Sequence, residues 1–316
     1  MINLKGLGVI AISTLFLATA GLARAEFPEK PIKIIVMYSP GGSTDVSTRI
    51  LARHLEPVLG VPVVVQNVPG GGGAVGYQQA LDARADGYTL TNYQDSLDVM
   101  EATGAVTFTQ DDFEPVAIWG TLALTIFAQK DGQYESLGSY VEAAAATPGE
   151  VGLAMGFGTP SQFVSKIVED AMSVDLNLVN VGGGAQKKAA VLGGHVDAGI
   201  EPMPGMAEPY KSGQFDILAV LAEERLETFP DIPTAKEQGV EAIHSNTFGL
   251  VAPKGTPEDR LQILSDAIGE VVTSEAFLED NAEINFNVDF TPRVEAKDKM
   301  ASVRDKMLSV GQSLGF

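Results

Sequence analysis

The chain has 316 residues, no cysteine and a formal net charge of −20 at pH 7. The lack of cysteine excludes disulfides and thiolate metal sites, and the acidic balance excludes nucleic acid as a natural partner, because phosphate binding needs clusters of Lys and Arg. At roughly 100–200 residues per domain, this length predicts two domains.

The first 25 residues have the pattern of a signal peptide. Lys5 precedes an apolar run over residues 7–22, and Ala23-Arg24-Ala25 matches an A-x-A cleavage site. The apolar run is shorter than the ~20 residues that a membrane-spanning helix needs. Cleavage after Ala25 removes Lys5 and Arg24 and no acid, so the net charge of −20 becomes −22. We therefore predict an exported protein of the bacterial periplasm.

The apolar run 32–38 predicts a strand buried on both faces, and the Ser-Pro-Gly-Gly sequence at 39–42 ends it. Residues 43–45 (Ser-Thr-Asp) offer N-cap oxygens for a helix. A strand, a glycine turn and a helix N-terminus point free backbone N–H groups and the positive end of the helix dipole at one place. Such a place suits a carboxylate or a phosphate, although an ordinary βα turn would have the same residues.

The alternation of strands and helices continues along the chain and predicts βαβ units. Strands are expected at 60–67, 88–93, 151–155, 176–181, 196–200 and 216–221, and two further strands around Trp119-Gly120 within 113–128. Helices are expected at 137–146 and 300–314, in the segments that end at about 85 and at Leu192, and in the segments that begin at Pro160 and Pro257. We interpret the pattern as an α/β fold of two similar lobes with a mostly parallel sheet in each. One lobe comprises 26–123 plus 248–316 and the other 124–247, and the return crossing lies between 221 and 251.

Other chemistries find little support in the sequence. Gly71-x-Gly73-x-x-Gly76 matches the dinucleotide-binding fingerprint, but it lies in the second βα unit and several residues separate it from the preceding strand. The three histidines are far apart and none has metal-ligand spacing, and no nucleophile motif such as G-x-S-x-G is present. We therefore expect no cofactor, no metal site and no enzymatic activity. Two glycine-rich anion sites on two lobes of an exported protein are typical of a solute-binding protein.

The chain closely resembles the receptors of tripartite tricarboxylate transporters, also called the Bug family. The motifs include Pro28-x-Lys-Pro-Ile, Ser39-Pro-Gly-Gly-x-x-Asp45, Asp86-Gly-Tyr-Thr-Leu90 and Leu192-Gly-Gly-x-Val-Asp197, and further matches lie at 63–73, 112–116, 229–239 and 249–257. The resemblance implies a type II (Venus-flytrap) periplasmic-binding-protein fold that closes on a small organic acid and delivers it to membrane permease subunits. It also implies that the turns at 39–45 and 156–162 hold a carboxylate through backbone groups and ordered waters.

Two departures from the family pattern lie in the second lobe. Phe163 occupies the usual histidine position, and Asn180-Val181 replaces a usual proline-tyrosine pair. Both remove polar or aromatic groups that the family places near the cleft.

The predicted ligand-binding residues are divided between the two lobes. They are Tyr38, Ser39, Gly41, Gly42, Ser43, Asp45, Gln94 and Asp95 in the first lobe and Gly158, Thr159, Ser161, Gln162, Gly183 and Glu201 in the second. The acidic Asp95 and Glu201 leave open an amine-bearing or zwitterionic ligand, and an enzyme on the same lobes is a further alternative. The protein is expected to be monomeric, and the length and carboxylate number of its ligand stay open.

Overall fold

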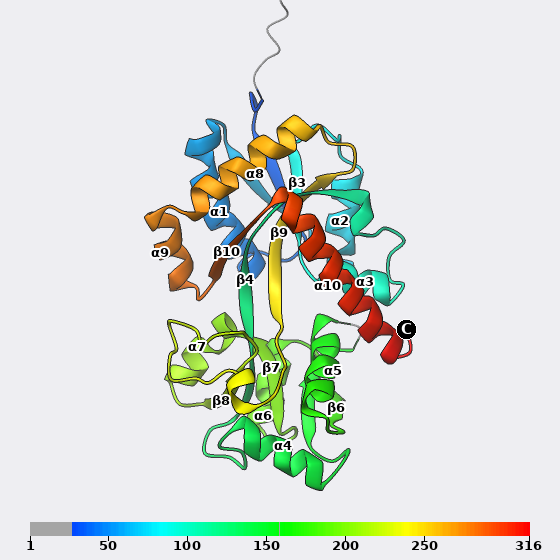
Figure 1. Ribbon diagram of the computed structural model, residues 1–316, viewed down its shortest axis with the longest axis vertical. Coiled ribbons are helices and arrows are strands. Elements are labelled where there is room, and N and C mark those ends of the chain that lie inside the picture. Colours follow the sequence, from blue (N-terminus) through cyan, green and yellow to red (C-terminus); the bar gives the residue numbers. More distant parts are fainter. Residues whose placement is uncertain (1–26, 158) are drawn as a thin grey trace, which may run out of the picture.

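The computed structural model of the protein describes residues 27–157 and 159–316, so the predicted signal peptide and Gly158 lie outside the described residues. Figure 1 shows two lobes stacked along the long axis of the molecule, with strands β4 and β9 running from one lobe into the other. The two-lobed α/β prediction is confirmed.

The first lobe is built from the two terminal parts of the described chain. Its sheet has the order β2-β1-β3-β9-β4, with β10 on the other edge of β4. The elements are β1 (Ile32–Val36), α1 (Ser43–Leu59), β2 (Val63–Asn67), α2 (Ala74–Leu81), β3 (Thr89–Tyr93), α3 (Ser96–Ala102), β4 (Phe113–Gln129), β9 (Ser245–Pro253), α8 (Glu258–Val272), α9 (Glu275–Glu283), β10 (Asn287–Pro292) and α10 (Arg293–Ser313), with short 3₁₀ turns at Gly71–Gly73 and Gln110–Asp112.

The second lobe is built on the far half of β4. That half pairs with β7 and β8, and β7, β5 and β6 follow one another as parallel neighbours. The elements are α4 (Leu137–Ala146), β5 (Gly152–Met155), α5 (Pro160–Met172), β6 (Asn177–Asn180), α6 (Gly184–Leu192), β7 (Ala198–Pro202), α7 (Met203–Lys211) and β8 (Phe215–Val220), with a 3₁₀ turn at Lys236–Gln238. Helix α5 begins as the sequence indicates, because Thr159 is its N-cap and Pro160 its first residue.

Strand β4 differs from the expectation of two strands around Gly120. It is one strand of 17 residues, and both lobes share it. Gly120 does not mark a turn; a Cβ at this position would lie 2.2 Å from the Phe286 ring, so the glycine makes room for the segment that enters β10. Because β4, β8, β9 and β10 run antiparallel to their partners, the sheet of each lobe is mixed, with three parallel strands beside the shared ones.

The strand registers show which way the parallel strands point. Tyr93, at the end of β3, pairs with Gly249, and β9 enters the first lobe at Ser245. β3 therefore ends toward the second lobe, as do β1 and β2, which run parallel to it. In the second lobe, β7 ends where Pro202 pairs with Leu124, at the point where β4 crosses between the lobes. The carboxyl ends of six parallel strands thus face the junction of the lobes.

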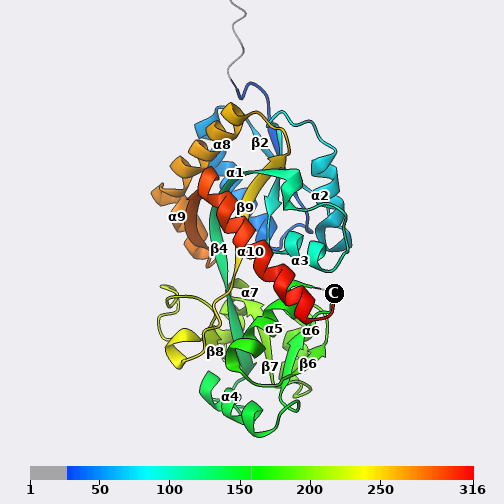
Figure 2. The same ribbon diagram turned by 45° about the vertical axis from the view of Figure 1, so that its right-hand side comes forward.

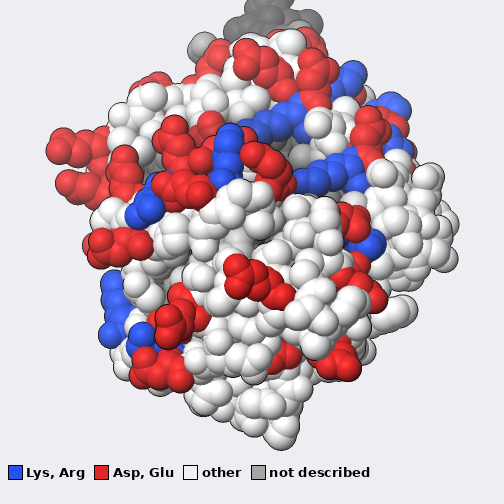
Figure 3. Space-filling view, turned by 60° about the horizontal axis from the view of Figure 1, so that its bottom comes forward, with Lys and Arg blue, Asp and Glu red and all other residues white. Residues whose placement is uncertain are grey.

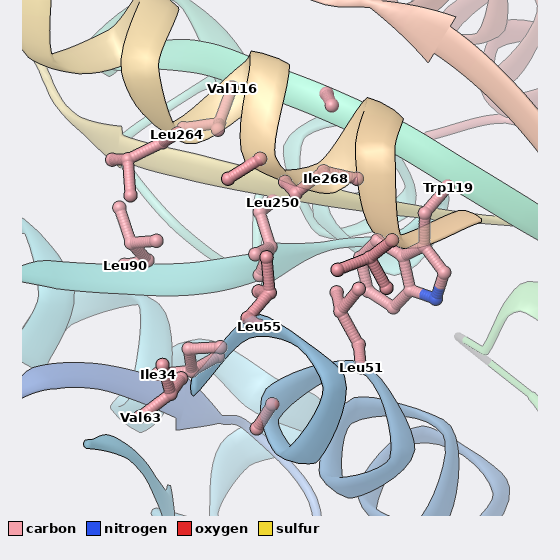
Figure 4. Packing of buried hydrophobic residues seen from close by; sticks show 14 of the residues in the cluster. Ile34, Leu51, Leu55, Val63, Leu90, Val116, Trp119, Leu250, Leu264 and Ile268 are labelled. Atoms are coloured by element: carbon pink, nitrogen blue, oxygen red, sulfur yellow. The ribbon is translucent and has the colours of Figure 1, made fainter. Parts of the chain in front are cut away.

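Each lobe has its own hydrophobic core. Figure 4 shows the core between α1, α8 and the first-lobe sheet, where the side chains of Leu55, Trp119 and Leu250 meet. The second lobe buries a separate cluster that includes Ile126, Leu153 and Val168. At about 25 cal/mol per Å² of apolar surface, burial of such side chains stabilises each lobe independently of the other.

Helix α10 crosses from the first lobe to the second, and its end lies beside α5 in both ribbon views (Figure 1, Figure 2). Figure 3 shows Lys and Arg side chains in a band across the upper part of the view, interleaved with Asp and Glu. On this face, the positive charges are thus separated by carboxylates instead of forming one basic surface.

Candidate functional site

The turn between β1 and α1 is held from inside by Asp45. This carboxylate is 3% exposed and accepts hydrogen bonds from the Gly41 N–H (2.9 Å), Arg49 Nε (2.9 Å) and Asn67 Nδ2 (2.8 Å). Burial would raise the pKa of the Asp45 carboxyl, but the hydrogen bonds from Arg49, Gly41 and Asn67 outweigh burial and lower it. Asp45 therefore shapes the turn, and the Gly41 N–H, expected to bind ligand, is already used by the protein.

The exposed part of this turn carries donors that are available to a ligand. Ser39, Gly41, Gly42 and Ser43 are exposed, and Gly42 is the N-cap of α1 with no side-chain cap. Gly41 has φ +83°, in the region that favours glycine. The N–H groups at the start of α1 and the helix dipole thus point toward an open surface at the lobe junction.

Two buried polar side chains fasten α1 to the end of β3. Gln94 Nε2 donates to Thr44 Oγ1 (3.0 Å) and Asn92 Nδ2 donates to Thr48 Oγ1 (2.9 Å). Gln94 is 8% exposed. Tyr38 is half-buried; burial raises its pKa, and a hydrogen bond with Ser96 opposes that rise. These contacts bring Tyr38 and Gln94 to the same end of the sheet as the α1 turn.

Asp95 contacts the strand that crosses between the lobes. Its carboxylate lies 3.0 Å from His244 Nε2 and accepts a 3.3 Å hydrogen bond from the Thr247 N–H. Asp95 and His244 are 3% and 8% exposed. The pair thus connects the end of β3 to the segment leading into β9.

The second-lobe turn is a compact set of hydroxyl and backbone contacts. Thr159 Oγ1 donates to the Gly156 carbonyl (2.6 Å), the Gly156 N–H donates to Ser161 Oγ (2.8 Å), and the two hydroxyl oxygens lie 3.1 Å apart. Thr159 is exposed and Ser161 half-buried, whereas Gln162 is buried at the start of α5. Gly158 lies outside the described residues. The turn brings two hydroxyl groups to the junction-facing end of β5.

Glu201 forms a buried ion pair at the start of α6. Its Oε2 lies 2.6 Å from Lys187 Nζ, and the Glu201 and Lys187 side chains are 16% and 6% exposed. Lys187 Nζ also donates to the Ile200 carbonyl (2.6 Å). A Cβ on Gly184 would lie 1.7 Å from Glu201 Oε1, so the carboxylate rests against the first turn of α6, beside the exposed N-cap Gly183.

The positions of Asp95 and Glu201 bear on the kind of ligand. The sequence leaves an amine-bearing ligand open because it predicts two acids near the cleft. In the structure, His244 lies against Asp95 and Lys187 against Glu201. Neither carboxylate is therefore free to bind the amine of a ligand, and the amine-bearing alternative loses its support.

Sequence reasoning missed several residues that hold the site together. Arg49, Asn67 and Asn92 support the first turn, Lys187 pairs with Glu201, and the Asn180 Oδ1 accepts the Phe157 N–H (3.1 Å). Asn67 belongs to a recognised motif, which was the only available signal. Phe163 is fully buried, packed against Phe316 and against Val99 and Met307, so its side chain is not open to a ligand.

A cavity of about 670 Å³ lies at the hinge and is lined by α10, the loop 222–228 and the turn between α9 and β10. None of the predicted binding residues lines it. The two turns remain the better candidate, because they combine free helix N–H groups with hydroxyls. The described residues bring no three His, Asp or Glu side chains together in a way that could hold a metal ion. No helix in the described ranges is long and apolar enough to cross a membrane.

Two lobes that share crossing strands and face each other with the carboxyl ends of their parallel strands define a solute-binding protein of the periplasmic-binding-protein fold. The sequence matches the family model "Tripartite tricarboxylate transporter family receptor" over residues 47–311. The chain belongs to this family, which confirms the resemblance, and the family consists of solute-binding receptors, not enzymes.

Individual relatives agree with this assignment. The chain is 34% identical to Protein BugT of Bordetella pertussis over 281 residues, which cover 86% of each chain. A TctC solute-binding protein from Polaromonas superposes with a TM-score of 0.79 at 25% identity, covering 91% of this chain and 99% of that one. An R. palustris protein with adipate superposes with a TM-score of 0.78 at 20% identity, covering 92% and 98%, and shows the shared fold.

Proposed function

We propose that the protein is a periplasmic receptor that captures a small organic carboxylate between its lobes and delivers it to the membrane permease subunits of a tripartite transporter. The observation that carries the proposal is that the α1 turn and the α5 turn follow parallel strands whose carboxyl ends face the junction of the lobes. Ligands of α/β sheets bind beyond these ends.

The donors proposed for the first carboxylate are the backbone N–H groups of Gly42 and Ser43 and the Ser43 hydroxyl. Gly42 and Ser43 are exposed, and no side chain caps α1. On the opposite lobe, the Thr159 hydroxyl donates to the Gly156 carbonyl, so the donor proposed there is the Ser161 hydroxyl, directly or through water. Donors on both lobes favour a ligand with a carboxylate at one end and an acceptor at the other. The adipate held by the R. palustris relative is such a molecule, and we propose a dicarboxylate here.

The remaining parts of the proposal concern organisation. We propose that the lobes divide at 26–123 plus 248–316 and at 124–247, since β4 leaves β9 and begins to pair with β7 and β8 at about Leu124. We propose the periplasm from the predicted signal peptide, and a monomer because one chain contains both halves of the proposed site.

A ligand screen tests the function. The purified mature protein is heated with C4 to C6 dicarboxylates, monocarboxylates, amino acids and polyamines, because a ligand at 100 times its Kd stabilises by about 2.7 kcal/mol. We expect dicarboxylates to raise the melting temperature and polyamines to leave it unchanged. A response to amines without a response to any acid would contradict the proposal.

A further inference from the structure

Helix α10 makes a connection between the lobes that does not involve the crossing strands. It begins at Arg293 in the first lobe, and its far end packs on α3 and α5 (Figure 2). Val99 of α3, Phe163 of α5 and Met307 of α10 form one cluster, and each is at most 1% exposed. A Cβ on Gly311 would lie 3.0 Å from Ala102 Cβ, which shows how closely α10 approaches α3.

The residues after α10 fold back onto the helix and fix the position of Phe316. Gly315 has φ +86°, and the N–H of Phe316 donates to the Gly311 carbonyl (3.0 Å). The Phe316 ring stacks on Phe163 with centroids 6.0 Å apart and an interplanar angle of 11°. Its centroid also lies 6.1 Å from that of Phe157. One ring from the first-lobe helix thus contacts two rings of the second lobe.

Those two second-lobe rings stand on either side of the α5 turn. Phe157 is 63% exposed, and its backbone N–H is held by Asn180. Phe163 is buried in the first turns of α5. The ring contact with Phe316 and the hydrogen bond to Asn180 together hold this exposed residue in place. The hydrogen bond from the neighbouring Gly156 N–H to Ser161 Oγ depends on the same stretch of backbone.

We propose that Phe316 is a positioning residue for the second-lobe binding turn: it stacks on Phe157 and Phe163 and so holds the hydroxyl of Ser161 in place for the ligand. The inference rests on the proposed role of this turn in binding. The buried, apolar ring of Phe163 gives Phe316 a flat surface to stack on.

Hydrogen exchange of the ligand-free protein tests the positioning directly. Phe316→Ala should speed the exchange of the Gly156 and Phe157 amides by about fivefold or more, whereas amides of β1 stay unchanged. Phe316→Tyr, which keeps the ring, should restore the wild-type rates. Leu278→Ala is the matched control, since Leu278 is a similarly exposed apolar residue (45%) on α9. Unchanged exchange at Gly156 and Phe157 in Phe316→Ala would overturn the inference.

Calorimetry with adipate as the probe adds the functional readout. Phe316→Ala should bind adipate about fivefold more weakly, with a melting temperature within about 2 °C of the wild type, because the ring is 42% exposed. Equal adipate affinity in Phe316→Ala and wild type would also overturn the inference. If the wild type binds no acid at all, the proposed function fails, and the exchange rates still decide whether Phe316 positions the turn.

Discussion

The ion pair between Lys187 and Glu201 gives a prediction whose size follows from the structure. Replacement of Lys187 by Met keeps an unbranched side chain as far as Cε and leaves the Glu201 carboxylate buried without its cation. Both side chains are largely inaccessible, at 6% and 16%, so solvent screens the charges little. Removing one partner of a buried pair costs about 3–5 kcal/mol, and the nearby N-terminus of α6 offsets roughly 1 kcal/mol of that cost. We therefore expect Lys187→Met to lower the free energy of unfolding by about 3 kcal/mol.

The assay is equilibrium unfolding in urea with and without the second change Glu201→Gln. The amide keeps the shape of the side chain that rests against Gly184 and removes the unpaired charge. The double variant should therefore recover about half of the stability lost in Lys187→Met. A cost below about 1 kcal/mol for Lys187→Met, or a double variant whose loss equals the sum of the single losses, would refute the reasoning.

Three further predictions concern the site. Gly184→Ala should displace the Glu201 carboxylate, which the ion pair with Lys187 holds in place, and destabilise the protein by about 1 kcal/mol in urea unfolding; a neutral effect would contradict the geometry. Asp45→Asn should destabilise most at neutral pH. The native pKa of Asp45 is lowered, so the ionised carboxylate contributes fully to the free energy of unfolding above the unfolded pKa of about 4. This contribution is lost as the pH falls through the native pKa. A stability difference between Asp45→Asn and wild type that stays constant from pH 6 to pH 3 would count against this. Asp95→Asn should weaken the contact with His244 and increase hydrogen exchange at the start of β9, and unaltered exchange there would show that Asp95 does not hold the hinge.

Short sequence patterns were enough to predict individual strands and helices and the two α/β lobes. The apolar run before Ser39 and the Pro160 start signal predicted β1 and α5, and the alternation of strands and helices predicted two α/β lobes. The single long strand β4 was not predictable, because Gly120 has the appearance of a break. The reason for this glycine is the ring of Phe286, 166 residues further along the chain.

The candidate site shows the same division. The exposed glycine turn at Gly42 follows from the residues around it, and the structure puts it at the lobe junction. The pairing of Asp95 does not follow from the residues around it, since its partners His244 and Thr247 come from the crossing segment about 150 residues away. Sequence therefore identifies which residues can bind an anion, but it does not tell which acids the protein has already paired.

The central claim is that free backbone N–H groups at the start of α1 bind a ligand carboxylate. Gly42 has φ −77°, which proline can adopt, and Pro202, Pro257 and Pro292 already occupy N-cap positions of other helices in this chain. Gly42→Pro should therefore leave the fold and the melting temperature of the ligand-free protein nearly unchanged while removing one donor.

The most direct test is a calorimetric titration of the wild type and Gly42→Pro with the dicarboxylate that raises the wild-type melting temperature most. We predict that Gly42→Pro weakens binding by at least about tenfold, the value of one charge-assisted hydrogen bond. Equal affinities of a folded Gly42→Pro and the wild type would contradict the account.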